Sequence, residues 1–126
     1  MNDSGRAARA AMDYFKLDPG AVTAFHDELD LAPFKVKVKV GGGTAGHNGL
    51  RSLDAHLGKD FRRVRIGIGH PGHKDKVTRH VLGNYAKAEM DPLADTLAAI
   101  AAEAEWLAQG DDARFMSDVA LRLKGD

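Results

Sequence analysis

At 126 residues, the chain is long enough for one domain with a hydrophobic core. Hydrophobic residues make up 44% and charged residues 29%, as in an ordinary soluble globular protein, and there is no cysteine, which excludes disulfides and thiolate chemistry. No segment approaches the roughly 18 apolar residues of a membrane-spanning helix, and the first residues lack the apolar core of a signal peptide. We therefore expect a single domain over residues 1–126 and a cytoplasmic location.

The charges are distributed unevenly along a chain whose formal net charge is zero. Residues 31–90 contain twelve lysines and arginines but only four aspartates and glutamates, whereas residues 1–30 and 91–126 are both acidic. A basic patch attracts phosphate groups even on a neutral molecule, so a polyanionic partner is one interpretation. The other is that the acidic helices cover the basic half and neutralise it.

Hydrophobic periodicity predicts an alternation of helices and strands. Asp91-Pro92 has the pattern of a helix start, and Gly110 that of a helix end. In chain order we expect a helix capped by Ser4 that ends before Pro19, a strand over 21–25 that stops at the polar cluster His26–Glu28, a strand over 34–40, a helix through Leu50, Leu53 and Leu57, a strand over 61–69, a polar loop with a short apolar piece around Val81, a helix from Asp91 to Gly110, and a last helix from Asp111 or Asp112.

This order of elements predicts an α/β layered fold with a mixed sheet. Three clear strands are few for a sheet that at least four helices must cover. Either strands are missing from the chain, or the sheet pairs with another chain.

Basic residues alternate with apolar ones in two of the expected strands. Lys35, Lys37 and Lys39 share one face of their strand, and Arg63 and Arg65 share one face of theirs. If the two strands pair, these side chains form a basic stripe suited to phosphate contacts. The alternative is that the lysines protect an edge strand against aggregation.

A glycine-rich loop, "GGGTAGHNG", leads directly into an expected helix. Backbone N–H groups of such a loop and the positive end of a helix can bind a phosphate or stabilise an oxyanion. The spacing matches neither the P-loop nor the dinucleotide fingerprint, and a glycine-rich turn alone is more often a tight connection. Asn48 either caps the helix or donates to a substrate carbonyl while accepting from a hydroxyl.

Two further polar clusters are candidates for chemistry. Asp27 in "HDELD" follows a strand and could orient an imidazole, although a solvated acidic turn is the simpler interpretation. His70 and His73 are spaced like metal ligands, with His47 and His80 elsewhere in the chain. Because a Pro-Gly turn separates the pair and no nearby carboxylate has an obvious purpose, we expect no metal site.

Five motifs occur together in this chain: "MNDSG", "HDELDLAP", "KVKVKVGGGTAGHNGLRSLDAHLG", "RVRIGIGHPG" and "VLGNY". In this order they resemble the bacterial-type peptidyl-tRNA hydrolases over essentially the whole sequence. The resemblance implies a three-layer α/β/α fold with a mixed sheet between helices. It also implies hydrolysis of the ester that joins a peptide to the 3′-terminal ribose of tRNA. The implied partner is tRNA, with no cofactor, metal or membrane, in a protein that is a monomer in its full-length form.

The resemblance also implies roles for individual residues. Asp27 corresponds to the aspartate that orients the catalytic histidine and stabilises its charged form. The remaining positions are those of substrate or tRNA binding: Asn2 and Asn48 near the ester, His47 in the same crevice, and Lys39 and Arg65 at the 5′-phosphate end of the tRNA.

The sequence departs from the family pattern in ways that affect activity. The opening strand, the "GLGNPG"-like turn and the general-base histidine that follows them have no counterpart here, so the chain resembles the C-terminal two-thirds of a family member. Phe34 also stands where glycine is usual after the proline. We expect weak or no hydrolysis, with a non-catalytic tRNA-binding remnant as the alternative. A third interpretation is a metal-free esterase with His26 or His47 as base.

Overall fold

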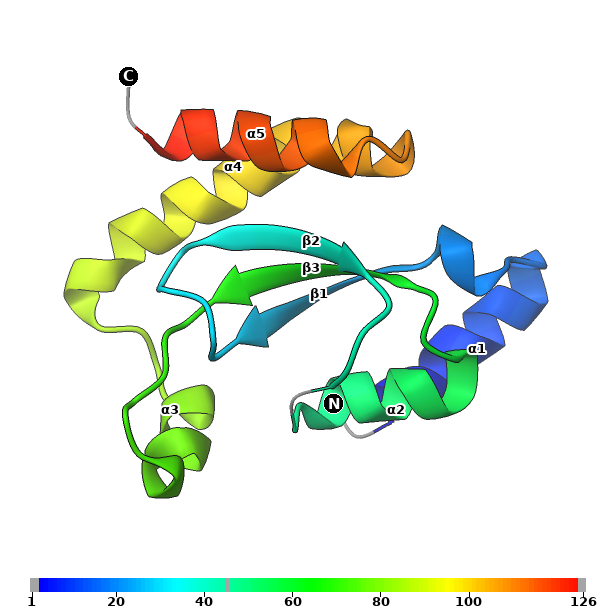
Figure 1. Ribbon diagram of the computed structural model, residues 1–126, viewed down its shortest axis with the longest axis horizontal. Coiled ribbons are helices and arrows are strands. Elements are labelled where there is room, and N and C mark those ends of the chain that lie inside the picture. The colour runs from blue at the N-terminus through cyan, green and yellow to red at the C-terminus, as the bar shows by residue number, and fades with distance from the viewer. Residues whose placement is uncertain (1–2, 45, 125–126) are drawn as a thin grey trace. The chain divides into compact units, whose positions relative to one another are not determined.

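The computed structural model describes residues 3–44 and 46–124, which form five α-helices and a three-stranded sheet (Figure 1). The chain divides into two compact units, one of residues 1–26 and 39–64 and the other of residues 27–38 and 65–126. The elements are α1 (Ser4–Phe15), β1 (Thr23–Glu28), β2 (Val36–Val40), α2 (Asn48–Leu57), β3 (Arg62–Gly67), α3 (Val77–Leu82), α4 (Met90–Ala108) and α5 (Asp112–Leu123), with short 3-10 turns at Pro19–Ala21, Lys74–Lys76 and Lys87–Glu89.

The sheet is mixed, with β3 between β1 and β2 (Figure 1). The N–H of Arg62 donates to Val22, and that of Ile68 to Glu28, so β1 and β3 run parallel in a constant register. The N–H of Gly67 donates to Lys35 and that of Gly41 to Phe61, which makes β2 antiparallel to β3. The expected α/β class, the mixed sheet and the pairing of the lysine-rich and arginine-rich strands are confirmed. The single domain stays a prediction.

A tight turn with an unusual residue begins β2. The N–H of Lys35 donates to the carbonyl of Ala32 at 3.1 Å, and Pro33 and Phe34 are the central residues. Phe34 has a φ of 67°, the left-handed conformation that the third position of a type II turn requires and that glycine usually fills. A side chain there costs about 1–2 kcal/mol. The ring is held by stacking on Tyr85, with centroids 5.9 Å apart.

Helices α1 and α2 pack on each other in one unit, around Met12, Leu50, Leu57 and Phe61. Phe61 is fully buried, which contributes up to about 3 kcal/mol of hydrophobic free energy. The helices approach closely because Gly5 has no side chain, since a Cβ there would overlap the Ser52 carbonyl. The Gly5 N–H donates to the Ser52 hydroxyl at 2.9 Å instead.

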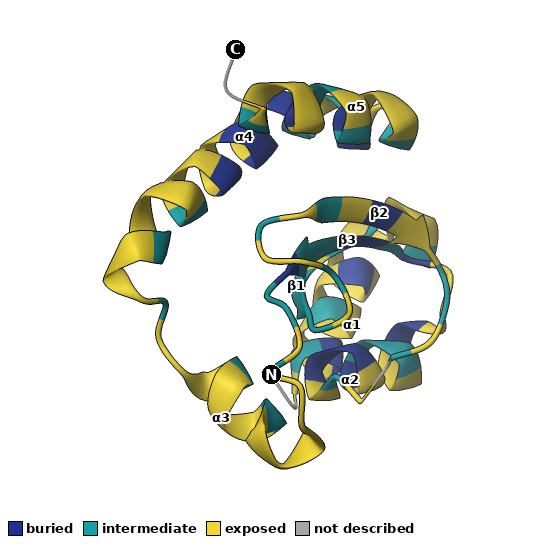
Figure 2. Ribbon diagram, turned by 60° about the vertical axis from the view of Figure 1, so that its left-hand side comes forward, coloured by how far each residue is buried: buried dark blue, intermediate teal, exposed yellow. Residues whose placement is uncertain are grey.

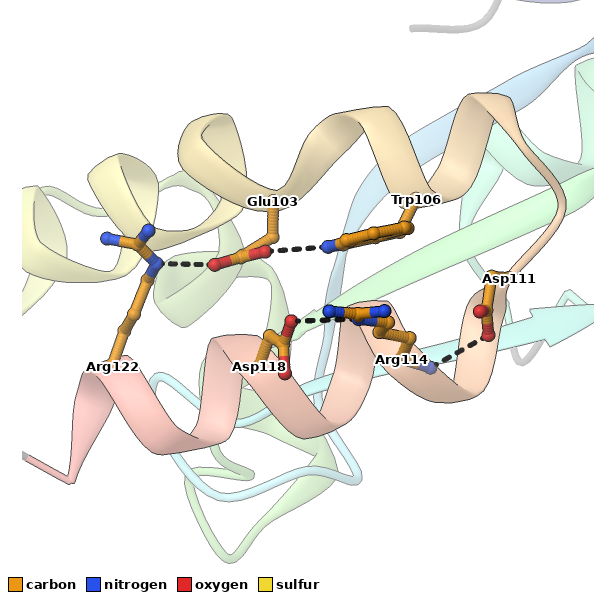
Figure 3. A network of polar contacts seen from close by, with 6 residues as sticks. All are labelled: Glu103, Trp106, Asp111, Arg114, Asp118 and Arg122. Carbon is orange, nitrogen blue, oxygen red and sulfur yellow. Dashed lines mark hydrogen bonds and ion pairs between the residues drawn. The ribbon is translucent and has the colours of Figure 1, made fainter.

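Helices α4 and α5 form a hairpin in the other unit. The second half of α4 carries most of its buried positions, and Phe115 and Val119 of α5 are buried as well (Figure 2). A polar network joins the helices (Figure 3): Arg122 Nε donates to Glu103 at 2.6 Å, and Trp106 Nε1 donates to the same carboxylate at 2.8 Å. These contacts fix the register of the hairpin.

Several element boundaries differ from those predicted. Asp3, not Ser4, precedes the first helical turn. The first strand spans Thr23–Glu28, because a 3-10 turn occupies Pro19–Ala21 and the polar residues after 25 continue the strand. The long helix begins at Met90, before the Asp-Pro pair, and the apolar piece around residue 81 belongs to helix α3.

The hydrogen bond from Arg122, and then that from Trp106, lower the pKa of Glu103 against the opposing effect of burial. A carboxylate whose pKa is lowered by folding stabilises the fold above its ordinary pKa of about 4.3, and this contribution disappears as the pH falls through the lowered value. We therefore expect Glu103→Gln to lower the melting temperature at about pH 7 and to have a smaller effect at about pH 3. Glu105→Gln, in the same helix, is the matched control. An equal loss at both pH values would contradict the ionic role.

Candidate functional site

The glycine-rich loop lies between β2 and α2 and is covered by a lysine side chain. The Lys39 chain lies over Gly42, so closely that a Cβ at Gly42 would be 2.7 Å from Lys39 Cε and Nζ. Gly42 has a φ of 99°, which other residues rarely adopt. Glycine at this position therefore permits both the bend of the loop and the approach of the ammonium group to it.

A buried arginine holds the other side of the loop. Arg63 of β3 is 1% exposed, and its guanidinium donates to the Gly43 carbonyl at 2.8 Å and to the Asp54 carboxylate of α2 at 2.9 Å. It also donates to the Lys59 carbonyl at 3.3 Å and lies 4.4 Å from the centroid of the Phe61 ring. One cation thus fixes the loop, helix α2 and strand β3 to one another.

His47 ends the loop and caps helix α2. Its Nδ1 accepts from the N–H of Leu50 at 3.2 Å, so a proton on a neutral ring is on Nε2. The N–H of His47 donates to the Thr44 carbonyl at 2.8 Å, which closes the turn. The ring meets that of His26 edge-to-face, with centroids 5.2 Å apart.

Asn48 is the first residue of α2 and is exposed. Its amide oxygen is 3.5 Å from the Arg51 guanidinium, a long contact that a substrate group can replace. Since the cap is His47, the amide of Asn48 is available at a helix N-terminus, where partial positive charge favours oxygen-rich groups. The interpretation of Asn48 as the cap is wrong.

Asp27 lies in β1, within the other unit, and is half-buried. The pKa of the Tyr85 phenol is raised, mainly by burial and to a smaller extent by the negative charges of Glu89 and Asp27. The interpretation of Asp27 as part of a solvated acidic turn is wrong, because the residue is part of the strand.

Arg65 is half-buried in β3, in the same unit as Asp27. Its Nε is buried and, among the residues that the structure describes, has no hydrogen-bond partner. Asn2 lies outside the described residues.

The structure thus brings Lys39, His47 and Asn48 together around the glycine loop of one unit, while Asp27 and Arg65 belong to the other. Sequence reasoning missed Arg63, which it assigned to an exposed basic face. The missing information was that both faces of β3 are buried at this point, where the neighbouring residues Arg63 and Val64 are both almost fully buried.

Residues 3–44 and 46–124 contain neither a metal-binding cluster nor a membrane-spanning helix. No group of three or more histidines, cysteines, aspartates or glutamates there could hold a metal ion. No helix in the same ranges has the length and apolar character needed to cross a membrane.

The sequence matches the family model described as peptidyl-tRNA hydrolase over residues 1–125. A protein named peptidyl-tRNA hydrolase from Rhizorhabdus wittichii is 75% identical over 98% of this chain, and one from Sphingopyxis alaskensis is 73% identical over 99%. The chain spans 65% and 66% of the lengths of these relatives.

The fold is also similar to a solved structure, that of peptidyl-tRNA hydrolase from Acinetobacter baumannii. The TM-score is 0.81 at 38% sequence identity, and the match covers 94% of this chain and 61% of that chain. The comparisons do not support the expectation that a segment with the catalytic histidine is missing, and it stays a prediction.

The cap at α2 gives a test of the local structure. His47→Ala removes the acceptor for the Leu50 N–H, so we expect a loss of about 1 kcal/mol in the free energy of unfolding. His47→Asp supplies another acceptor and a charge that suits the helix N-terminus, so most of this loss should be recovered. Chemical denaturation of the three proteins measures both effects. Equal losses in the two variants would mean that the His47 ring stabilises the fold through its contact with His26 and not through the cap.

Proposed function

Because the chain belongs to the peptidyl-tRNA hydrolase family, we propose that it acts on peptidyl-tRNA, hydrolysing the ester between the peptide and the 3′-terminal ribose. The family match over residues 1–125 is the observation that carries the proposal. The biological result is the recycling of tRNA from peptides released early in translation, in the cytoplasm. This assignment accounts for a basic central segment in a chain of zero net charge.

Asn48 and Asn2 bind the substrate near the ester in this proposal. The exposed amide of Asn48 at the start of α2 supports the assignment, because its long contact with Arg51 engages the amide oxygen and not the NH2 group that donates. The amide donates to the carbonyl oxygen of the ester, and the nearby helix N-terminus favours the negative charge that develops there. His47 lines the same crevice, with its Nδ1 engaged by the cap.

Asp27 orients the general-base imidazole and stabilises its charged form. A base that takes a proton from the attacking water typically contributes about 10²–10⁴-fold to the rate. By resemblance, none of the six histidines of this sequence corresponds to that base. The weak or absent activity expected from this is not supported by the comparisons and stays a prediction.

Lys39 and Arg65 grip the phosphate at the 5′ end of the tRNA. The half-buried Arg65 guanidinium supplies one positive charge and several N–H donors for phosphate oxygens. The exposed Lys39 ammonium over the glycine loop supplies a second positive charge. Charge-assisted contacts of this kind position the tRNA without reading its sequence.

Hydrolysis of an N-acetylated aminoacyl-tRNA by the 126-residue chain tests the function. The R. wittichii relative serves as the reference for the rate. We expect slower turnover than by the relative, little change in this chain from Asp27→Asn, and weaker substrate binding from Asn48→Ala, because that residue contacts the substrate and not the base. Release of the free amino acid derivative and filter binding of the tRNA measure the two quantities separately.

A rate close to that of the relative, abolished by Asp27→Asn, would contradict the assignment of the base. One of the histidines in these 126 residues would then be the base, with His47 the first candidate. Failure to bind the tRNA at all would contradict the proposed function itself.

The phosphate grip predicts a specific salt dependence. Lys39→Ala and Arg65→Ala should each weaken the binding of all tRNAs alike, and each should reduce the slope of log K against log salt by roughly one. Lys87→Ala, a lysine with no assigned contact, is the control. An unchanged slope in either variant would contradict the assignment of that residue to a phosphate contact.

A further inference from the structure

A groove lies between the start of β2 and helix α5, and both of its walls belong to the same compact unit. Its volume is about 550 Å³. Residues Pro33–Lys37 form one wall, and residues of α5 and its C-terminal end, from Met116 to Lys124, form the other. This space accommodates several side chains of a bound segment.

The interior of the groove is apolar. Phe34 and Val36 line it from the strand side, and Met116, Val119 and Leu123 line it from the helix. Phe34 is held here in a left-handed conformation that glycine would adopt without strain. This residue therefore holds a strained backbone conformation at the point where the chain lines the groove.

The rim of the groove is positively charged. Lys35 and Lys37 on the strand side and Lys124 on the helix side are all exposed. No ion pair between these lysines and a carboxylate occurs within residues 3–44 and 46–124. No acidic residue lines the groove. The charge that complements this surface is therefore negative.

The backbone of β2 also has a free side. From Lys35 to Gly41 the residues bonded to β3 alternate with residues that are not, so Val36 and Val38 direct their backbone groups away from β3. The Val38 N–H donates to the thioether of Met116 at 3.3 Å, and sulfur is a weak acceptor. An extended peptide can add to such an edge through its own backbone.

We propose that the groove between β2 and α5 binds an extended acidic segment of a partner protein in which carboxylate and apolar side chains alternate. Its apolar side chains pack against Phe34, Met116 and Leu123, and its carboxylates pair with the rim lysines. Its backbone pairs with that of Val36. A nucleic-acid strand would satisfy the lysines but not the apolar walls, so the apolar lining favours a peptide.

The probe is an acetylated and amidated hexapeptide of alternating glutamate and leucine, titrated into the isotope-labelled chain. We expect saturable shifts of the backbone amide signals of Val36, Lys37 and Leu123. Lys35→Glu combined with Lys124→Glu should weaken binding roughly tenfold or more. Lys74→Glu combined with Lys76→Glu makes the same change of charge outside the groove and should leave binding intact. A peptide N-methylated on alternate residues should bind less tightly, because it cannot complete the strand pairing.

Absence of saturable shifts would overturn the proposal, as would equal binding of a lysine–leucine peptide or equal effects of the two double variants. Equal binding of the N-methylated peptide would overturn the strand pairing. Displacement of the peptide by oligouridylate with the same shifts would assign the groove to nucleic acid. Dimer formation that depends on Lys35 would assign it to a second copy. The lysine–leucine and N-methylated peptides are tested on the unmodified protein. They therefore test the proposal even where a lysine variant folds poorly.

Discussion

The buried guanidinium of Arg63 is the interaction on which the glycine-loop site depends. It binds the Asp54 carboxylate, the Gly43 carbonyl and the Lys59 carbonyl while it is almost completely removed from water. Removal of one partner of such a buried pair typically costs about 3–5 kcal/mol, because the other charge is left uncompensated. The loop is rich in glycine, which has access to many backbone conformations, so the loop sequence alone does not select one of them. The hydrogen bonds of Arg63 therefore hold in one conformation a loop whose own sequence favours many.

The order of this loop determines the positions of the groups assigned to the substrate. The loop carries Lys39 over Gly42 at one end and passes into the His47 cap of α2 at the other. The cap leaves the Asn48 amide at the helix N-terminus to face outward. In the proposed function these are binding groups. Asp27 and Arg65 belong to the other unit, and the proposed function assigns Asp27 to the general base and Arg65 to a phosphate contact.

Regular patterns predicted the fold better than they predicted the site. The strict alternation of Val36–Val40 and the apolar spacing of α2 were sufficient for the correct elements. Val38, Leu50 and Leu57 are buried as these patterns indicate, whereas Val40 is 56% exposed. Arg63 could not be assigned in this way. An arginine in a strand is normally exposed, and only the sheet order, with Asp54 on the adjacent helix, makes its burial favourable. The role of His47 could not be assigned from the sequence either, since histidine is not among the preferred capping residues.

Amide hydrogen exchange at Leu50 in the Asp54→Asn variant tests the role of Arg63 most directly. The substitution preserves the size of the side chain but removes the charge that compensates Arg63, and the Leu50 N–H reports the His47 cap at the far end of the loop. The account predicts that protection of this amide falls at least about tenfold, which corresponds to about 1.4 kcal/mol, while Asp60→Asn, an exposed control nearby, has no such effect. Unchanged protection of Leu50 in Asp54→Asn would mean that the loop holds its conformation without the buried ion pair, and would contradict the account.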